Sequence, residues 1–279
     1  MKLHTINTGL FKLDGGAMFG VVPRSMWERL TTPDSKGLCT WAMRCMLVED
    51  GEKLILIDCG LGDKQSEKFF SHYEPHGDDT LSKSLHSLGF SHDDITDVLL
   101  THLHFDHCGG AIKREGDTLV PAFKNAHYWS HSEHWEWATK PNAREKASFL
   151  KENILPIESS GQLIFADKTD KVLHPAIDLK TASGHTESMF IPHIQYKDKT
   201  ILYAADLFPS RWHIPIPYVM AYDTRPLMTL AEKEIILTEA AQKDYILFFE
   251  HDPRTEMCSL EQTEKGVKEK ETFRLSDFE

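Results

Sequence analysis

The chain has 279 residues, of which 41% are hydrophobic and 27% charged, a composition typical of a folded globular protein. Its formal net charge of −12 opposes the phosphates of nucleic acids, so a role in RNA or DNA processing is disfavoured. The sequence has neither an apolar run long enough for a membrane span nor an apolar signal region near its start, so we expect a cytoplasmic protein.

The first hundred residues predict several strands and one helix. Residues 3–13 and 41–49 are predicted strands, and Lys53–Ile57 is a short apolar strand. Leucines at helical spacing predict a helix over 79–89. The apolar run Asp97–Thr101 is a further predicted strand, and it leads directly into a histidine-rich segment.

The middle of the chain predicts a helical region followed by strands. Residues 131–153 favour helix, with an interruption near Pro141 because proline lacks a backbone donor and clashes with the preceding turn. Strands are then expected over 162–166 and 171–181.

A hairpin and a long helix follow. Ser188–Tyr196 and Thr200–Ala205 are predicted to pair as a hairpin around a polar turn. Residues 226–243 predict a strong helix that opens on its proline, and we expect Asp223 or Thr224 to cap it.

The end of the chain predicts one buried strand and a polar tail. Tyr245–Glu250 is the strand, and the charged residues from Leu260 onward are expected at the surface. Strands therefore occur in groups with helices between them, which indicates a layered α/β architecture. We expect a single domain over residues 1–279.

The most informative segment is Thr101–His107, which carries the pattern His-x-His-x-Asp-His. Imidazole and carboxylate groups are the ligands of zinc and similar divalent ions. One short turn can aim His102 and His104 at one ion, and Asp106 and His107 at another. A pair of ions can activate a water and polarise a substrate, so the pattern favours a hydrolase over a histidine-rich surface turn.

Three further candidate ligands stand where predicted strands end. His185 precedes the hairpin, Asp206 follows its second strand, and His251 follows the last buried strand. Polar residues directly after apolar strands share one rim of a sheet, where functional sites gather. Each of the three taken singly could also be a capping or loop residue.

Five segments in this order resemble the metallo-β-lactamase superfamily: Leu56–Gly60, Thr101–Gly110, Gly184–Thr186, Ala205–Asp206 and Glu250–His251. The resemblance implies an αβ/βα four-layer sandwich, with two mixed β-sheets and helices on the outer faces. It also implies a two-metal site at one edge of the sheets.

Carried over residue by residue, the resemblance assigns a role to each candidate ligand. The implied ligands are His102, His104 and His185 for the first ion, Asp106, His107 and His251 for the second, and Asp206 as the bridge between them. Asp58 is implied to hold the far ring nitrogen of a ligand histidine. The expected cofactors are two divalent ions, Zn²⁺ first, with Mn²⁺, Fe²⁺ or Co²⁺ as alternatives.

Within the superfamily, the chain is most similar to the dinuclear lactonase and organophosphate-hydrolase branch. Residues 121–128 and the tryptophan-bearing segment that follows carry this likeness. Two departures stand against it: Glu187–Met189 replaces a Pro-Gly-His sequence, and Pro209 occupies the place of a tyrosine in the autoinducer lactonases. A mechanism that uses the hydroxyl of that tyrosine is therefore not expected here.

The predicted activity is hydrolysis of an ester or lactone by a hydroxide that bridges two ions, with phosphotriesters as a further substrate class. Asp106 is expected to orient the nucleophile and to carry a proton to the leaving group. A thioester hydrolase of the glyoxalase II kind and a mononuclear iron dioxygenase on the same fold stay open as alternatives. The expected partner is a small-molecule ester or lactone rather than nucleic acid or membrane, and a homodimer is left open.

Several residues near these motifs have less specific expectations. Gly15–Gly20 is glycine-rich and apolar, and we interpret it as a mobile loop that lines a pocket or contacts a second copy, with ordinary packing as an equal alternative. The segment that follows Asp206 is aromatic and could line a pocket, with His213 as an incidental loop histidine. Cys108 is expected to pack behind the metal motif rather than to bind an ion, since all five cysteines are predicted to be reduced structural thiols. A second metal site at His127, His131 and His134 is not expected.

Overall fold

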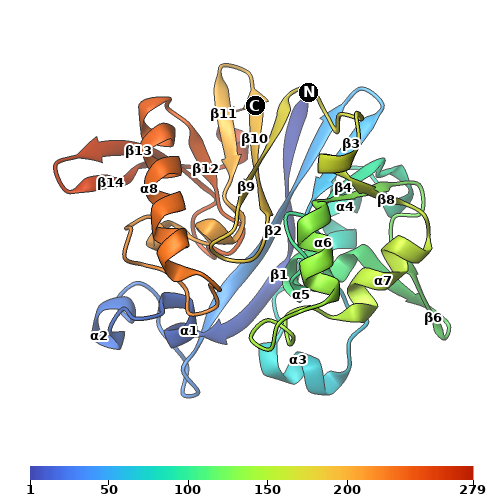
Figure 1. The fold of residues 1–279 in the computed structure, drawn as a ribbon, viewed down its shortest axis with the longest axis horizontal. Coiled ribbons are helices and arrows are strands. Elements are labelled where there is room, and N and C mark those ends of the chain that lie inside the picture. Colours follow the sequence, from blue (N-terminus) through green and yellow to red (C-terminus); the bar gives the residue numbers. More distant parts are fainter. Residues whose placement is uncertain (279) are drawn as a thin grey trace. The chain divides into compact units, whose positions relative to one another are not determined.

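The computed structural model describes residues 1–278 and divides into two compact units, each described below by itself. The first unit consists of Met1–Gly9 and Met43–Pro175, and the second consists of Leu10–Ala42 and the residues from Ala176 onward. Figure 1 shows the ribbon with its element labels. The sequence-based expectation of one domain stays a prediction.

A six-stranded sheet in the order β1-β2-β3-β4-β7-β8 forms the centre of the first unit. The neighbours β2 and β3 are antiparallel, whereas β3, β4, β7 and β8 run parallel, so the sheet is mixed. Its strands are β1 (Lys2–Asp14), β2 (Leu38–Asp50), β3 (Lys53–Ile57), β4 (Asp97–Leu99), β7 (His127–Ser130) and β8 (Leu163–Phe165), and β1 and β2 extend beyond the first unit.

Short helices and one small hairpin complete the first unit. Polar N-caps begin α3 and α4, where Ser66 and Thr80 accept backbone hydrogens of the first turn. The helices are α3 (Glu67–Tyr73), α4 (Leu81–Ser87), α5 (Phe105–Cys108), α6 (Ser132–Thr139) and α7 (Lys151–Ser159), with 3-10 turns at His92–Asp94, Gly109–Ala111 and Ala166–Lys168. The hairpin joins β5 (Ile112–Glu115) to β6 (Thr118–Pro121).

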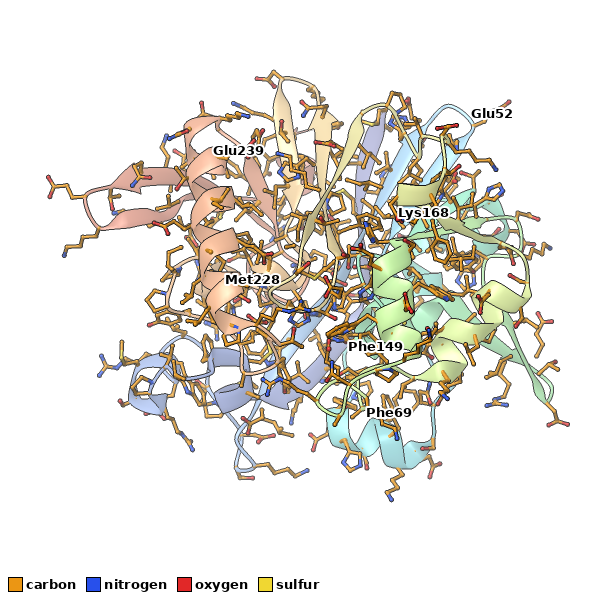
Figure 2. All side chains as sticks on the ribbon, in the orientation of Figure 1. Glu52, Phe69, Phe149, Lys168, Met228 and Glu239 are labelled. Carbon is orange, nitrogen blue, oxygen red and sulfur yellow. The ribbon has the colours of Figure 1, made fainter. Side chains whose placement is uncertain are left out.

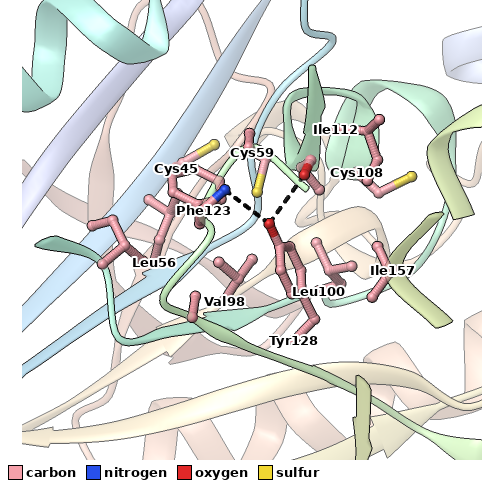
Figure 3. Close-up of a cluster of buried hydrophobic side chains, with 14 of the residues drawn as sticks. Cys45, Leu56, Cys59, Val98, Leu100, Cys108, Ile112, Phe123, Tyr128 and Ile157 are labelled. Carbon is pink, nitrogen blue, oxygen red and sulfur yellow. Dashed lines mark hydrogen bonds between the residues drawn. The ribbon is translucent and has the colours of Figure 1, made fainter. Parts of the chain in front are cut away.

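The core of the first unit forms behind the histidine-rich segment. Tyr128 is fully buried there, and its hydroxyl accepts the amide hydrogen of Phe123 and donates to the carbonyl of Ala111, both at 3.1 Å (Figure 3). The fully buried Cys108 belongs to the same cluster, and burial raises the pKa of its thiol to about 12. Its packing role, expected from the sequence, therefore agrees with its position.

The second unit carries another six-stranded mixed sheet, in the order β14-β13-β12-β11-β10-β9. Its neighbours are antiparallel except for the parallel pair β11 and β12. The strands are β9 (Ile177–Ala182), β10 (Met189–Tyr196), β11 (Lys199–Tyr203), β12 (Ile246–Phe248), β13 (Met257–Thr263) and β14 (Gly266–Phe273). The long helix α8 (Pro226–Gln242) packs against β13 and β14 (Figure 1).

The glycine-rich segment after β1 is a helix and not the mobile loop predicted from the sequence. α1 spans Gly15–Phe19, and the Asp14 carboxylate caps it by accepting the Ala17 amide hydrogen at 2.7 Å. Phe19 is fully buried and stacks on the rings of Trp27 and His213. The remaining short elements are α2 (Arg24–Trp27) and 3-10 turns at Ala205–Leu207, Arg211–His213 and Leu275–Phe278.

The α/β class and the two mixed sheets predicted from the sequence are confirmed, and two further local predictions are wrong. α8 begins at Pro226, but Arg225 occupies its N-cap in place of Asp223 or Thr224. The strand predicted over 171–181 begins only at Ile177. The polar tail lies largely at the surface, as predicted, and contributes to the β13–β14 hairpin at the sheet edge. None of the helices in residues 1–278 has the length and apolar character that a membrane crossing requires.

Candidate metal centre

The histidine-rich segment lies between β4 and α5 in the first unit, and one buried carboxylate fixes its path. Asp58 directly follows β3, and its two oxygens accept the amide and hydroxyl hydrogens of Thr101 at 2.8 and 2.6 Å. Oδ2 of Asp58 also lies 3.2 Å from Nδ1 of His107. The carboxylate therefore links the end of one strand to the loop that follows its neighbour.

Close backbone packing explains the two glycines behind this segment. A Cβ atom on Gly109 would lie 2.0 Å from the carbonyl oxygen of Leu61, and one on Gly110 would lie 2.2 Å from that of Cys59. The amide of Cys59 donates to the carbonyl of His107 at 2.7 Å across the same contact. Glycine is required here for space and not for a special backbone angle.

Two histidines of the first unit direct ring nitrogens at each other. The Thr101 hydroxyl donates to Asp58, so its oxygen accepts the Nδ1 hydrogen of His102 at 3.1 Å. Nε2 of His104 lies 3.4 Å from the Glu145 carboxylate, which favours the proton on that nitrogen. Nε2 of His102 and Nδ1 of His104 lie 3.1 Å apart, so the two atoms can share a hydrogen or bind one metal ion together.

In the second unit, Asp206 has a similar electrostatic arrangement with two histidines. Nδ1 of His185 donates to Asp223 at 2.8 Å, and Nδ1 of His251 donates to the carbonyl of Ala42 at 2.7 Å. Both histidines therefore direct their Nε2 atoms at the carboxylate of Asp206, at 3.2 and 3.1 Å. Ring nitrogen and carboxylate oxygen at this separation can share a hydrogen or bind one metal ion together.

The backbone around His185 is held by the first turns of α8. The Glu232 carboxylate accepts the amide hydrogens of Ser183 and Gly184 at 2.7 and 2.9 Å. A Cβ atom on Gly184 would lie 2.4 Å from the Thr229 hydroxyl oxygen, so the loop approaches the helix as closely as glycine permits. The position of His185 therefore depends on α8 as well as on its own loop.

An aromatic group flanks the Asp106 side of the first unit. The Phe105 ring lies 4.5 Å from that of Tyr73 and 5.3 Å from that of Phe69, centroid to centroid. Burial, followed by the charge of Asp106, raises the pKa of Tyr73 to about 12, so its hydroxyl stays protonated at neutral pH. Half-buried aromatic rings thus stand next to a carboxylate of the predicted ligand set.

Two other histidines serve the scaffold. His134 is buried on α6, and its Nε2 accepts the amide hydrogen of Leu103 at 2.8 Å. His213 donates from Nε2 to the carbonyl of Met18 and accepts the Ser210 hydroxyl hydrogen at Nδ1, both at 2.8 Å. Burial lowers the pKa of His213 to about 3, so the imidazole is neutral at neutral pH. Both of its ring nitrogens are engaged in hydrogen bonds within the scaffold.

The seven predicted ligands therefore form two groups, one in each unit. The first unit carries His102, His104, Asp106 and His107, and the second carries His185, Asp206 and His251. Sequence reasoning missed the carboxylates that orient them from distant segments: Glu145, Asp223 and Glu232. Of these three, the sequence analysis named only Asp223, and it assigned that residue as a helix cap because it shortly precedes the proline that begins α8.

Comparison with known proteins identifies the family. The sequence-family model of the metallo-beta-lactamase superfamily matches residues 44–249, which is most of the chain. The chain therefore belongs to this superfamily, and the family predicted from the sequence motifs is confirmed.

Relatives agree with the predicted hydrolase class. An N-acyl homoserine lactonase from Bacillus thuringiensis is 25% identical over 90% of this chain and 93% of its own length. The crystal structure of a probable metal-dependent hydrolase from Staphylococcus aureus is 27% identical and covers 98% of both chains, with a TM-score of 0.87. The dizinc quorum-quenching lactonase AidC covers 98% of this chain and 95% of its own, with 23% identity and a TM-score of 0.77, and shares the fold. The chain is thus a hydrolase of this superfamily, related to metal-dependent lactonases.

Proposed function

We propose that this protein hydrolyses a small-molecule ester or lactone with two divalent metal ions, Zn²⁺ first among the candidates. In this proposal the first ion is held by His102, His104 and His185, the second by Asp106, His107 and His251, and Asp206 bridges the two. The observation that carries the proposal is the close approach of potential ligand atoms: His102 faces His104, and Asp206 faces two histidines, at 3.1–3.2 Å. One ring nitrogen of His102, His185 and His251 is engaged by Thr101, Asp223 and the carbonyl of Ala42, and this contact directs the other nitrogen at the candidate metal ligands.

Two bound ions would supply an activated water and an electrophile for the carbonyl oxygen. The chain itself contributes orientation and proton transfer. Asp58 and Asp223 fix the tautomers of His107 and His185. Asp106 lies in the first turn of α5. Its buried carboxylate is 3.8 Å from Nε2 of His107, where it can accept a proton and pass it to the leaving oxygen.

The aromatic group of Phe69, Tyr73 and Phe105 supports a substrate with an apolar part. These rings lie beside the histidine-rich segment of the first unit, and apolar surface of this kind binds acyl or alkyl groups by the hydrophobic effect. The N-acyl lactone hydrolysed by the Bacillus thuringiensis relative has this chemistry. An ester or lactone with an apolar chain is therefore the substrate class that we favour.

Pro209 stands at the position where an autoinducer lactonase is expected to have a tyrosine. Its carbonyl accepts the amide hydrogen of His251 at 3.0 Å. This position therefore supports His251 through its backbone and supplies no hydroxyl to a substrate. Catalysis would depend on Asp106 and the metal ligands for proton transfer and charge stabilisation. Thioesters are the second substrate class, since the same geometry can attack their carbonyl carbon.

The test combines metal content with turnover. Purified protein reconstituted with Zn²⁺ should hold about two ions per chain and hydrolyse an N-acyl lactone, and activity should disappear with a chelator and return with metal. His102→Ala and Asp206→Ala should each lose bound metal and at least ~100-fold in turnover. His127→Ala, at an exposed histidine on β7, is the matched control and should retain both.

A single bound iron with oxygen consumption would instead identify a dioxygenase. A preference for thioesters over lactones in kcat/KM would identify the thioesterase alternative. Saturation with Zn²⁺ or Mn²⁺ at one ion or fewer would contradict the dinuclear proposal.

A further inference from the structure

The segment between α6 and α7 places the carboxylate of Glu145 next to the ring of His104. The side-chain oxygen of Asn142 accepts the amide hydrogens of Arg144 and Glu145 at 2.9 and 3.1 Å, which closes a tight turn. The carbonyl of Glu145 then accepts the amide hydrogen of Ser148 at 2.8 Å. Ser148 in turn accepts the amide hydrogen of Phe105, the first residue of α5, at 3.0 Å. Backbone hydrogen bonds thus tie this turn to the start of the helix that carries Asp106.

The Glu145 side chain is 2% exposed and tightly oriented. Its Oε2 accepts hydrogen bonds from the indole of Trp137 and the amide of Asn142, both at 2.6 Å. Its Oε1 lies 3.4 Å from Nε2 of His104. Two neutral donors therefore hold one carboxylate oxygen and leave the other directed at the imidazole.

The His104 ring is also held by packing. Its centroid lies 4.7 Å from that of Phe149, a residue of the same connecting segment that is labelled in Figure 2. Phe149 lies in addition 5.8 Å from the ring of His134, which binds the backbone of Leu103. A carboxylate and an aromatic ring from one connecting segment therefore lie against the ring of His104.

We propose that Glu145 is a positioning residue that holds the Nε2 proton of His104 and aims Nδ1 at a metal ion. This inference depends on the proposed function, because it takes His104 as a ligand. A carboxylate behind a ligand imidazole raises its basicity and fixes its orientation, and such partners commonly contribute 10–100-fold to metal affinity. Asp58 and Asp223 hydrogen-bond the Nδ1 atoms of His107 and His185 at 3.2 and 2.8 Å, and Glu145 occupies the corresponding place beside His104 at 3.4 Å.

The test is Glu145→Gln, which keeps the size of the side chain and removes its charge. Zn²⁺ affinity is measured by competition with a chromophoric chelator, and the visible spectrum of the Co²⁺-saturated protein reports ligand geometry independently of activity. We expect the affinity for one of the two ions to fall 10–100-fold and the Co²⁺ spectrum at saturation to shift. Glu136→Gln is the control on the exposed face of α6, where Glu136 pairs with Lys140, and it should change neither reading.

A second variant keeps the inference testable if Glu145→Gln does not fold. Trp137→Phe removes one donor that orients the carboxylate but leaves its charge, so a smaller loss of affinity for the same ion is expected. If the wild-type protein binds two ions and both variants keep its metal affinity and Co²⁺ spectrum, the role of Glu145 is wrong. The proposed function then still stands. Wild-type protein that binds no pair of ions would overturn the proposed function itself, and the inference with it.

Discussion

Oδ1 of Asp223 lies 2.8 Å from Nδ1 of His185, although 38 residues separate the two in the chain. Both side chains are buried, at 2% and 1% exposure, so water does not compete for this hydrogen bond. The contact places the ring hydrogen of His185 on Nδ1 and turns Nε2 toward Asp206. Its function is therefore to orient His185 and not to cap α8.

Asp223→Asn should weaken metal binding about 10–100-fold while the protein stays folded. The amide is the same size but carries no charge, so it raises the basicity of His185 less than the carboxylate does. Titration of Zn²⁺ against a chelator measures the effect. Asp244→Asn, at an exposed position near the end of α8, is the control, and equal affinities for the two variants would refute the role given to Asp223.

The fold could be predicted, and candidate ligands could be proposed, because their signals are local. A strand such as Lys53–Ile57 is marked by its own apolar side chains, and the candidate ligands stand directly after strands of this kind. The motif Thr101–His107 concentrates four candidate ligands in one turn. Each of these features can be recognised without knowledge of any distant residue.

The carboxylates that orient the ligands could not be predicted in this way. The chain has 43 acidic residues, and nothing local distinguishes Glu145 or Asp223 from those at the surface. Their roles arise only when a turn or a loop folds back on a histidine from another element. The β13–β14 hairpin was missed for a different reason: its outer strand is polar and rich in lysine and glutamate, as edge strands often are, and resembles a solvated tail.

Gly110→Ala should destabilise the protein by about 1–3 kcal/mol, because the new methyl group has no room. Its Cβ would meet the carbonyl oxygen of Cys59 at 2.2 Å, and a backbone atom cannot rotate away as a side chain does. Urea unfolding measures the change. Gly16→Ala is the comparison, since its Cβ would meet only the Asp14 side chain at 3.0 Å. Similar stabilities of the two variants would show that the backbone contact behind His107 is less tight than the structure indicates.

Lys233→Met should also lower stability, by about 1–3 kcal/mol. The Lys233 ammonium is completely buried and donates to the carbonyls of Pro215, Ile216 and Tyr218 at 2.8–3.3 Å. Methionine fills the same volume but leaves these acceptors without their donor. Thermal unfolding measures the loss, and Lys243→Met at the exposed end of the same helix should shift Tm much less. An unchanged Tm for Lys233→Met would mean that water replaces the ammonium at no cost.

His213 should make the metal-free protein sensitive to acid. Burial lowers its pKa from 6.5 to about 3, so between these values the unfolded chain binds a proton that the folded chain excludes. Stability therefore falls as pH decreases from 6.5 toward 3, and each pKa unit corresponds to about 1.4 kcal/mol. The contribution of this one residue approaches about 4–5 kcal/mol near pH 3.

His213→Gln isolates that contribution, because glutamine can hydrogen-bond but does not titrate. The variant should be less stable at pH 7, since it fits the contacts with Met18 and Ser210 less well. Its stability should nevertheless fall less steeply than that of the wild type when the pH is lowered from 6.5. Urea unfolding of both metal-free proteins at a series of pH values gives the two slopes. Equal slopes of stability against pH would show that His213 takes up a proton in the folded state. Water would then reach the His213 ring where it stacks on Phe19.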